Sequence, residues 1–188
     1  ESYGYYAFLF ILPNLVSSLG SFGFGPSIVY HINKIEFNLT RYLGTFTFLG
    51  MILGLIYIFI ILFFFNYINK IFYNNNLDIT LFLISLFFIP IMIIQKYLRA
   101  IIRGMYNIKL FSFLLDLSIP ILRLIFVSVF IFINLGLLGI VFVPVIVQAI
   151  ITIYIFIYLF KKSEFNTSNI FIKKDHFKLI SKFAFKNY

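Results

Sequence analysis

Long apolar runs alternate with short polar stretches along this chain. Five runs are long enough to cross a bilayer as helices, because about 20 apolar residues span a hydrocarbon core of roughly 30 Å. They cover about residues 5–30, 42–65, 77–94, 110–133 and 137–160. Lipid offers a backbone amide no partner, so each run is predicted to be an α-helix. The pattern therefore predicts an all-α, polytopic bundle of transmembrane helices.

The composition agrees with lipid as the solvent. The chain is 62% hydrophobic and only 11% charged, whereas soluble domains average about 45–50% apolar and about 25% charged residues. A small globule cannot hide that much apolar surface from water. The composition therefore excludes an ordinary soluble domain.

Basic residues fall in alternate connections between the runs. All but two of the 15 Lys and Arg residues lie in the first connection, in the third, or after the fifth run; the exceptions are Lys70 and Arg123. Cytoplasmic loops are enriched in Lys and Arg. We therefore expect Glu1 outside the cell and the region after Lys161 in the cytoplasm. This topology accounts for the net charge of +9 without a nucleic-acid partner.

The sequence contains no motif typical of an enzyme active site or of a metal site. There is no cysteine, and the two histidines, His31 and His176, are far apart. No catalytic triad, HExxH or phosphate-binding glycine loop occurs. We expect a protein that is not an enzyme and that holds neither metal nor cofactor.

The first run is the least uniform of the five. Pro13 removes a helix hydrogen bond and is expected to kink the helix, and Asn14, Ser17, Ser18 and Ser21 recur near one face. Such polar residues either pack against neighbouring membrane helices or line a cavity beside a bent helix.

Two further features concern helix packing. Gly50 and Gly54 form a GxxxG pair, which marks a close-packing face in an apolar helix. Gln148 lies near the centre of the fifth run. An interhelical hydrogen bond is favoured for Gln148, and a polar lining of a cavity is the alternative.

The fourth run contains two charges, Asp116 and Arg123. Seven residues correspond to roughly 10.5 Å along a helix, with both side chains on nearly the same face. A central Arg costs about 2.5–3.5 kcal/mol in lipid, so Arg123 is expected to face the bundle interior or water. On a structural interpretation, Arg123 binds backbone carbonyls or an Asp on another helix. On a functional interpretation, it meets an anionic substrate or takes part in ion coupling.

Three stretches of the chain, residues 1–34, 97–125 and 176–188, share features with a known family. The positions concerned are Tyr3, Gly4, Gly20, Gly23, Gly25, Ser27, Lys34, Arg103, Gly104 and Lys109. In order, the stretches resemble the second span, a later loop and span, and the lead-in to the second half of the bacterial O-antigen-type polysaccharide-unit flippases of the multidrug/oligosaccharidyl-lipid/polysaccharide exporter superfamily. A proline that the family has near the start of its seventh span is absent here.

The resemblance implies a transporter of two lobes and 12–14 spans. Residues 1–160 would hold five spans of the N-terminal lobe, residues 161–176 a cytoplasmic linker and residues 177–188 the start of the C-terminal lobe. The implied location is the bacterial cytoplasmic membrane. The implied activity is to flip an undecaprenyl-diphosphate-linked oligosaccharide to the outer leaflet, with membrane lipids, a polysaccharide polymerase and glycosyltransferases as further partners.

On this interpretation Arg123 meets the diphosphate, and Asn14, Ser18 and Gln148 meet sugar hydroxyls. Two alternatives stay open. An ion-coupled multidrug extruder of the same superfamily would use Asp116 as its coupling residue. A non-transporting membrane scaffold would lock Arg123 in an interhelical ion pair and would have no cavity.

Overall fold

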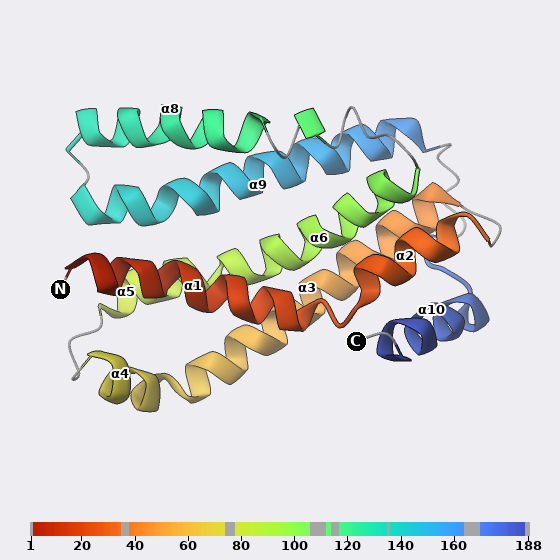
Figure 1. Ribbon diagram of the computed structural model, residues 1–188, viewed down its shortest axis with the longest axis horizontal. Helices are drawn as coiled ribbons and strands as arrows, with labels where there is room; N and C mark the ends of the chain where they lie inside the picture. Colours follow the sequence, from red (N-terminus) through yellow and green to blue (C-terminus); the bar gives the residue numbers. More distant parts are fainter. Residues whose placement is uncertain are drawn as a thin grey trace.

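The computed structural model describes residues 2–34, 38–73, 78–105, 112–113, 117–134, 136–163 and 170–186. Within these ranges the regular structure is helical throughout, which confirms the all-α prediction. Figure 1 shows the helices running along one long axis. They are α1 (Ser2–Gly20), α2 (Phe24–Ile32), α3 (Leu39–Phe63), α4 (Phe65–Tyr73), α5 (Ile79–Leu86), α6 (Phe88–Gly104), α8 (Ser118–Phe132), α9 (Gly136–Lys162) and α10 (Lys174–Lys186).

Three helical stretches in the described ranges are long and apolar enough to cross a membrane. They are Leu39–Phe63, Ile79–Gly104 and Val141–Lys162, and the bent pair of α1 and α2 makes a fourth if it counts as one span. These lengths are typical of a membrane protein. Helix α8 is apolar but has only 15 residues.

The first run is broken into two helices at residues 21–23. Helix α1 continues through Pro13 to Gly20, and the bend of 47° lies between Gly20 and Phe24. Phe22 and Gly23 adopt positive φ angles of 43° and 66° there. A left-handed backbone conformation ends a helix sharply, so the helix of the first run is interrupted at residues 21–23, while the expected kink at Pro13 stays a prediction.

The third run extends further as a helix than its apolar part. The predicted span ended at residue 94, but α6 continues to Gly104. Lys96, Arg99 and Arg103, which the sequence placed in a loop, therefore lie on α6. Hydropathy falls at Gln95, yet Lys, Arg and Ala are good helix formers, so the helix does not end there.

Other boundaries agree more closely. Helix α9 covers the predicted fifth run, and α10 begins at Lys174, three residues before the predicted start at residue 177. The described part of the fourth run is helical from Ser118. Asp116 lies outside the described residues, as does most of residues 110–116.

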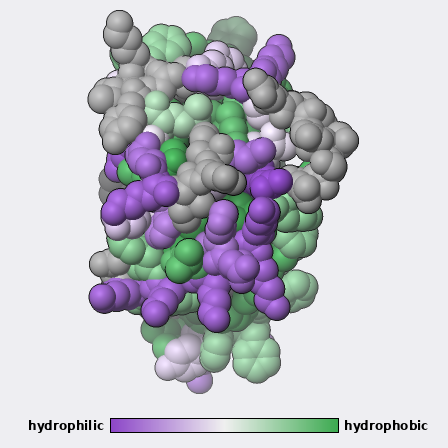
Figure 2. Space-filling view, turned by 90° about the vertical axis from the view of Figure 1, so that its right-hand side faces the viewer, coloured by the Kyte–Doolittle hydropathy of each residue, from purple (hydrophilic) through white to green (hydrophobic). Residues whose placement is uncertain are grey.

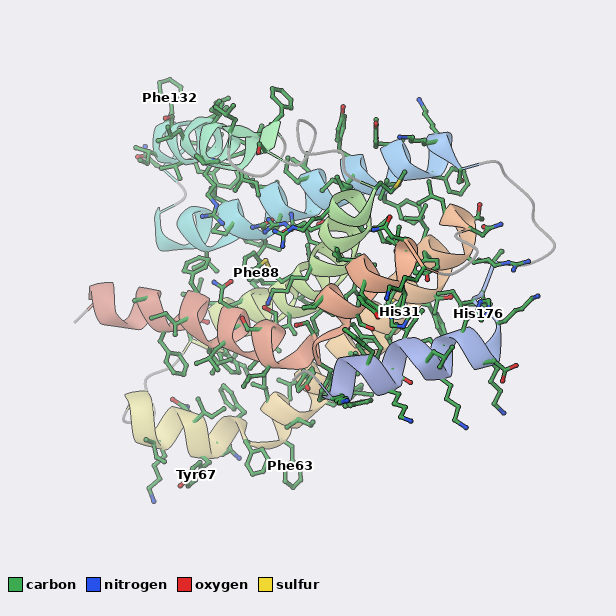
Figure 3. All side chains as sticks on the ribbon, turned by 45° about the vertical axis from the view of Figure 1, so that its right-hand side comes forward. His31, Phe63, Tyr67, Phe88, Phe132 and His176 are labelled. Atoms are coloured by element: carbon green, nitrogen blue, oxygen red, sulfur yellow. The ribbon has the colours of Figure 1, made fainter. Side chains whose placement is uncertain are left out.

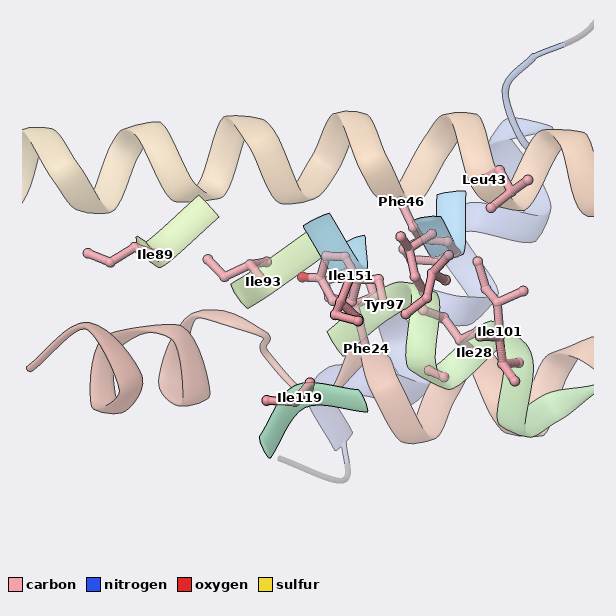
Figure 4. Close-up of a cluster of buried hydrophobic side chains, with 14 of the residues drawn as sticks. Phe24, Ile28, Leu43, Phe46, Ile89, Ile93, Tyr97, Ile101, Ile119 and Ile151 are labelled. Carbon is pink, nitrogen blue, oxygen red and sulfur yellow. The ribbon is translucent and has the colours of Figure 1, made fainter. Parts of the chain in front are cut away.

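Helix α6 is at the centre of the bundle and contacts α1, α2, α3 and α9. Tyr97 of α6 is fully buried and meets Phe24 of α2 and Phe46 of α3, with ring centroids 6.1 and 5.6 Å apart. Phe24 and Phe46 are 5.9 Å apart, so the three rings form a closed aromatic cluster. Figure 4 shows this cluster, with Ile93 and Ile101 on either side of it along α6.

Gly50 and Gly54 allow α3 to approach α6 closely, as the GxxxG pair predicted. A Cβ atom at Gly50 would lie 2.8 Å from Ile94 Cγ1, and one at Gly54 would lie 2.5 Å from Pro90 Cα. The Pro90 backbone cannot swing aside, so Gly54 requires glycine, whereas a Cβ atom at Gly50 would force the Ile94 side chain to shift.

The outer surface is apolar along the sides and basic at one end. Phe63, Tyr67 and Phe132 point away from the bundle (Figure 3) and are 84%, 66% and 89% exposed. Hydrophilic side chains gather at the right-hand end of Figure 1, which faces the viewer in Figure 2. Exposed apolar area on this scale marks contact with lipid or with other protein.

We expect Gly54→Ala to destabilise the full-length protein, because the added methyl group meets the Pro90 backbone. Overpacking of this kind costs about 1–3 kcal/mol and should lower the melting temperature in detergent by several degrees. Gly25→Ala is the matched control, since nothing lies within 4 Å of a Cβ atom there. Equal melting temperatures for the two variants would contradict the close α3–α6 approach.

Single cysteines should be labelled from opposite sides of the membrane at the two ends of the bundle. The chain has no cysteine of its own, and Lys70 and Lys174 are both exposed. An impermeant maleimide added to intact cells should react with Lys70→Cys and not with Lys174→Cys, with the parent protein as blank. Labelling of both from outside would refute the topology.

Candidate functional site

A pocket of about 600 Å³ opens between α2, α6 and α10 near the basic end of the bundle. Its cationic side is formed by Lys96, Arg99 and Arg103, and none of the described residues that line it is acidic. The remaining lining residues are Gly25, Pro26, Val29, Tyr30, Ala100 and Phe183. We call this site the cationic pocket.

Helical spacing brings the three cations to one side of α6. Lys96, Arg99 and Arg103 follow one another at intervals of three and four residues, which places them on neighbouring turns of one face. Arg99 Nη2 donates to Gln95 Oε1 at 2.9 Å, which steadies the guanidinium against its own helix. Lys96 and Arg99 are half-buried and Arg103 is exposed, so the row runs from the bundle towards solvent.

Lys96 also contacts the end of α1. Its Nζ donates to Ser17 Oγ at 3.3 Å and to Ser18 Oγ at 3.2 Å. Both serine hydroxyls donate to the carbonyl oxygen of Asn14, at 2.9 and 2.7 Å, so their lone pairs are left to accept from Lys96. The ammonium group thereby links the cationic pocket to the turn of α1 just before the bend.

The apolar wall of the pocket comes from α2 and α10. The Tyr30 and Phe183 rings are stacked, with centroids 4.5 Å apart and an interplanar angle of 13°. Lys34 Nζ donates to Tyr30 Oη at 2.7 Å and lies 4.3 Å from the centre of that ring. His31 lies between α2 and α10 (Figure 3), where its Nδ1 is 2.9 Å from the Ser27 carbonyl oxygen and its ring packs edge-on against Phe183.

The site residues predicted from sequence are only partly brought together. Ser18 is bonded to Lys96, a pocket residue. Asn14 is exposed on the preceding turn, and its amide donates to the Phe10 carbonyl oxygen of its own helix at 2.9 Å. Gln148 and Arg123 lie on α9 and α8, away from the pocket lining, and Asp116 falls in the undescribed part of the chain.

The sequence offered two surroundings for Arg123, the bundle interior or water. In the described bundle Arg123 does not face the interior. The side chain is exposed on α8, which packs chiefly against α9. Gln148 is 4% exposed, and its Oε1 has no hydrogen-bond partner among the described residues. The expected interhelical hydrogen bond to that oxygen is therefore not formed there.

Sequence reasoning missed the three pocket cations as site residues. It counted them as loop charges that report topology. The spacing of three and four residues between these cations could have indicated that they share one face of a helix. That inference requires the helix to continue beyond residue 94, which hydropathy did not predict.

The arrangement is suited to binding an anion with an apolar neighbour. Three cations on one helix face favour phosphate or carboxylate, while Tyr30 and Phe183 offer apolar surface. No group of His or acidic side chains suited to a metal occurs in the described ranges. Comparison with family models, curated proteins and solved structures finds no match to this chain.

Gln95 and Gln148 make a matched test of buried amides. Gln148→Leu should leave the melting temperature of the full-length protein unchanged or raise it, because an unsatisfied buried oxygen is removed. Gln95→Leu should be the less stable of the two variants, because it removes the hydrogen bond from Arg99 Nη2 to Gln95 Oε1 as well as a buried Nε2 that has no partner among the described residues. Thermal unfolding in detergent measures both. A larger loss for Gln148→Leu would show that this amide has a partner.

Proposed function

We propose that this chain is part of a membrane transporter that flips an undecaprenyl-diphosphate-linked oligosaccharide across the bacterial cytoplasmic membrane. The observation that carries the proposal is the cationic pocket, in which Lys96, Arg99 and Arg103 lie beside an apolar wall. A diphosphate cannot cross hydrocarbon unshielded, so a flippase needs cations where the head group enters.

The position of the pocket supports loading from the cytoplasmic leaflet. It lies towards the basic end of the bundle, where α2, α6 and α10 meet, and the positive-inside rule assigns such an end to the cytoplasm. The head group would bind Lys96 and the two arginines while the prenyl chain stays in the leaflet. Sugar hydroxyls would then face Tyr30 and the serines of α1.

The proposal retains the five-span arrangement. Helix α8 would be the fourth span and α9 the fifth, with a second lobe facing the described helices as in the family that the sequence resembles. Alternating access would rock the two lobes about the bound head group. Arg123, Asn14 and Gln148 would then contact substrate only after it leaves the cationic pocket.

The pocket favours a binding function over a membrane scaffold. A scaffold predicts no cavity and an Arg123 locked between helices, whereas a pocket of about 600 Å³ is present and Arg123 is exposed. An ion-coupled drug extruder would depend on Asp116, and it would not need three cations around one pocket.

Removal of a single pocket cation should weaken binding of undecaprenyl diphosphate by the full-length protein. A hydrogen bond to a charged group contributes about 1.5–3 kcal/mol, so Lys96→Gln or Arg103→Gln should raise Kd at least about tenfold. Binding of the radiolabelled lipid to purified protein measures this. Lys96→Arg keeps the charge and should retain most of the affinity.

Lys70→Gln is the control, because it removes one positive charge at the opposite end of the bundle. Unchanged affinity in both pocket variants, at equal expression and folding, would refute the proposal. Tight binding of a cationic drug that is unaffected by Lys96→Gln would point to the extruder instead.

A further inference from the structure

Helix α10 carries a row of lysines on its outward face. Lys174, Lys178, Lys182 and Lys186 are each four residues apart, and all four are exposed. Residues at this spacing are neighbours on one side of a helix. They form a lysine stripe roughly 18 Å long, from the rise of about 1.5 Å per residue.

The opposite face of α10 is fixed against α2. Ser27 Oγ donates to the Ile180 carbonyl oxygen at 2.6 Å, and Ile180 and Ala184 are fully buried. The stacking of Phe183 on Tyr30 adds a third contact. Because these contacts set the rotation of the helix, α10 cannot turn its lysines inward.

The surroundings of the stripe indicate a membrane surface rather than the acyl region or bulk water. Lysines facing acyl chains cost about 2.5–3.5 kcal/mol each near the bilayer centre, so the stripe must lie outside that region. Leu179 flanks it and is 54% exposed. Phe185 is 63% exposed, and the inner side of its ring packs against Phe22 and Phe24, with centroids 6.0 and 6.2 Å apart. Lysines beside exposed Leu and Phe are typical of a helix that lies at the boundary between head groups and acyl chains.

Helix α10 also lies at the suitable end of the bundle. It is found at the right-hand end in Figure 1, where hydrophilic side chains gather in Figure 2. Lys161 and Lys162 end α9 at the same side. Both helices thus present positive charge to one membrane surface, which attracts anionic lipids.

We propose that the lysine stripe of α10 binds the anionic head groups of the adjacent leaflet. The ammonium groups contact lipid phosphates, while the exposed Leu179 reaches the upper acyl region. This anchors α10, and through Phe183 and Tyr30 it also holds the wall of the cationic pocket. The inference does not depend on what the pocket itself binds.

A tryptophan reporter tests the contact, because the chain has no tryptophan. The full-length Leu179→Trp protein is reconstituted in vesicles that contain equal amounts of phosphatidylglycerol and phosphatidylcholine. In one sample the phosphatidylglycerol is brominated, and in the other the phosphatidylcholine is brominated. The emission of the parent protein is subtracted from both. Brominated phosphatidylglycerol should quench the reporter at least about twofold more than brominated phosphatidylcholine. At 1 M salt the Debye length is about 3 Å, so the preference should shrink.

Ile153→Trp is the matched control, since that residue is 57% exposed on α9 without a lysine stripe, and both lipids should quench it equally. In the Leu179→Trp protein, Lys178→Gln combined with Lys182→Gln should abolish the stronger quenching by brominated phosphatidylglycerol. Lys178→Arg combined with Lys182→Arg should keep it. Equal quenching of the Leu179→Trp reporter by the two lipids, or no quenching by either, would overturn the proposal. The salt titration needs no lysine variant, so the test stands even if the double variant fails to fold.

Discussion

The packing of α6 against its neighbouring helices is the constraint on which the rest of the structure depends. Tyr97 closes an aromatic cluster with Phe24 and Phe46, so α2 and α3 are both positioned by one ring of α6. One and two turns further along α3, Gly50 and Gly54 let this helix approach α6 closely. In lipid there is little hydrophobic drive between helices, so such close packing has to supply the association energy.

The same constraint places the cations. Successive side chains on a helix are about 100° apart, so a helix that buries Tyr97 and Ile101 must turn Lys96, Arg99 and Arg103 to another side. Helix α2 lies beside the face of α6 that carries the cations. The positive φ angles at Phe22 and Gly23 redirect α2, and Gly25 and Pro26, just after this bend, line the cationic pocket. Core and site are consequently two faces of one helix.

Hydropathy predicted the helical class and the three stretches of the described chain that are long enough to cross a membrane, because a backbone in lipid must satisfy its own hydrogen bonds; five spans stay a prediction. It does not locate features that have another physical cause. The 47° bend lies where Phe22 and Gly23 adopt positive φ angles, and no hydropathy scale reports backbone conformation. The pocket cations were assigned to a loop because charged residues usually end a membrane span. A helix can nevertheless continue through charged residues, since helix formation does not require apolar side chains. The contact between α10 and α2 joins residues 153 apart in sequence, which a single sequence cannot pair.

Arg123 bears on which side of the bundle meets water. It is exposed on α8 together with Leu124 and Ile125, and a guanidinium among acyl chains is costly even on the most lenient scale. The sequence offered two ways to avoid this cost, the bundle interior or an aqueous face, and the first is not used by the described helices. In the proposed transporter the outer face of α8 would therefore border the water-filled cleft between lobes. The cationic pocket and Arg123 would then be successive binding positions along the route of the diphosphate, and not parts of a single site.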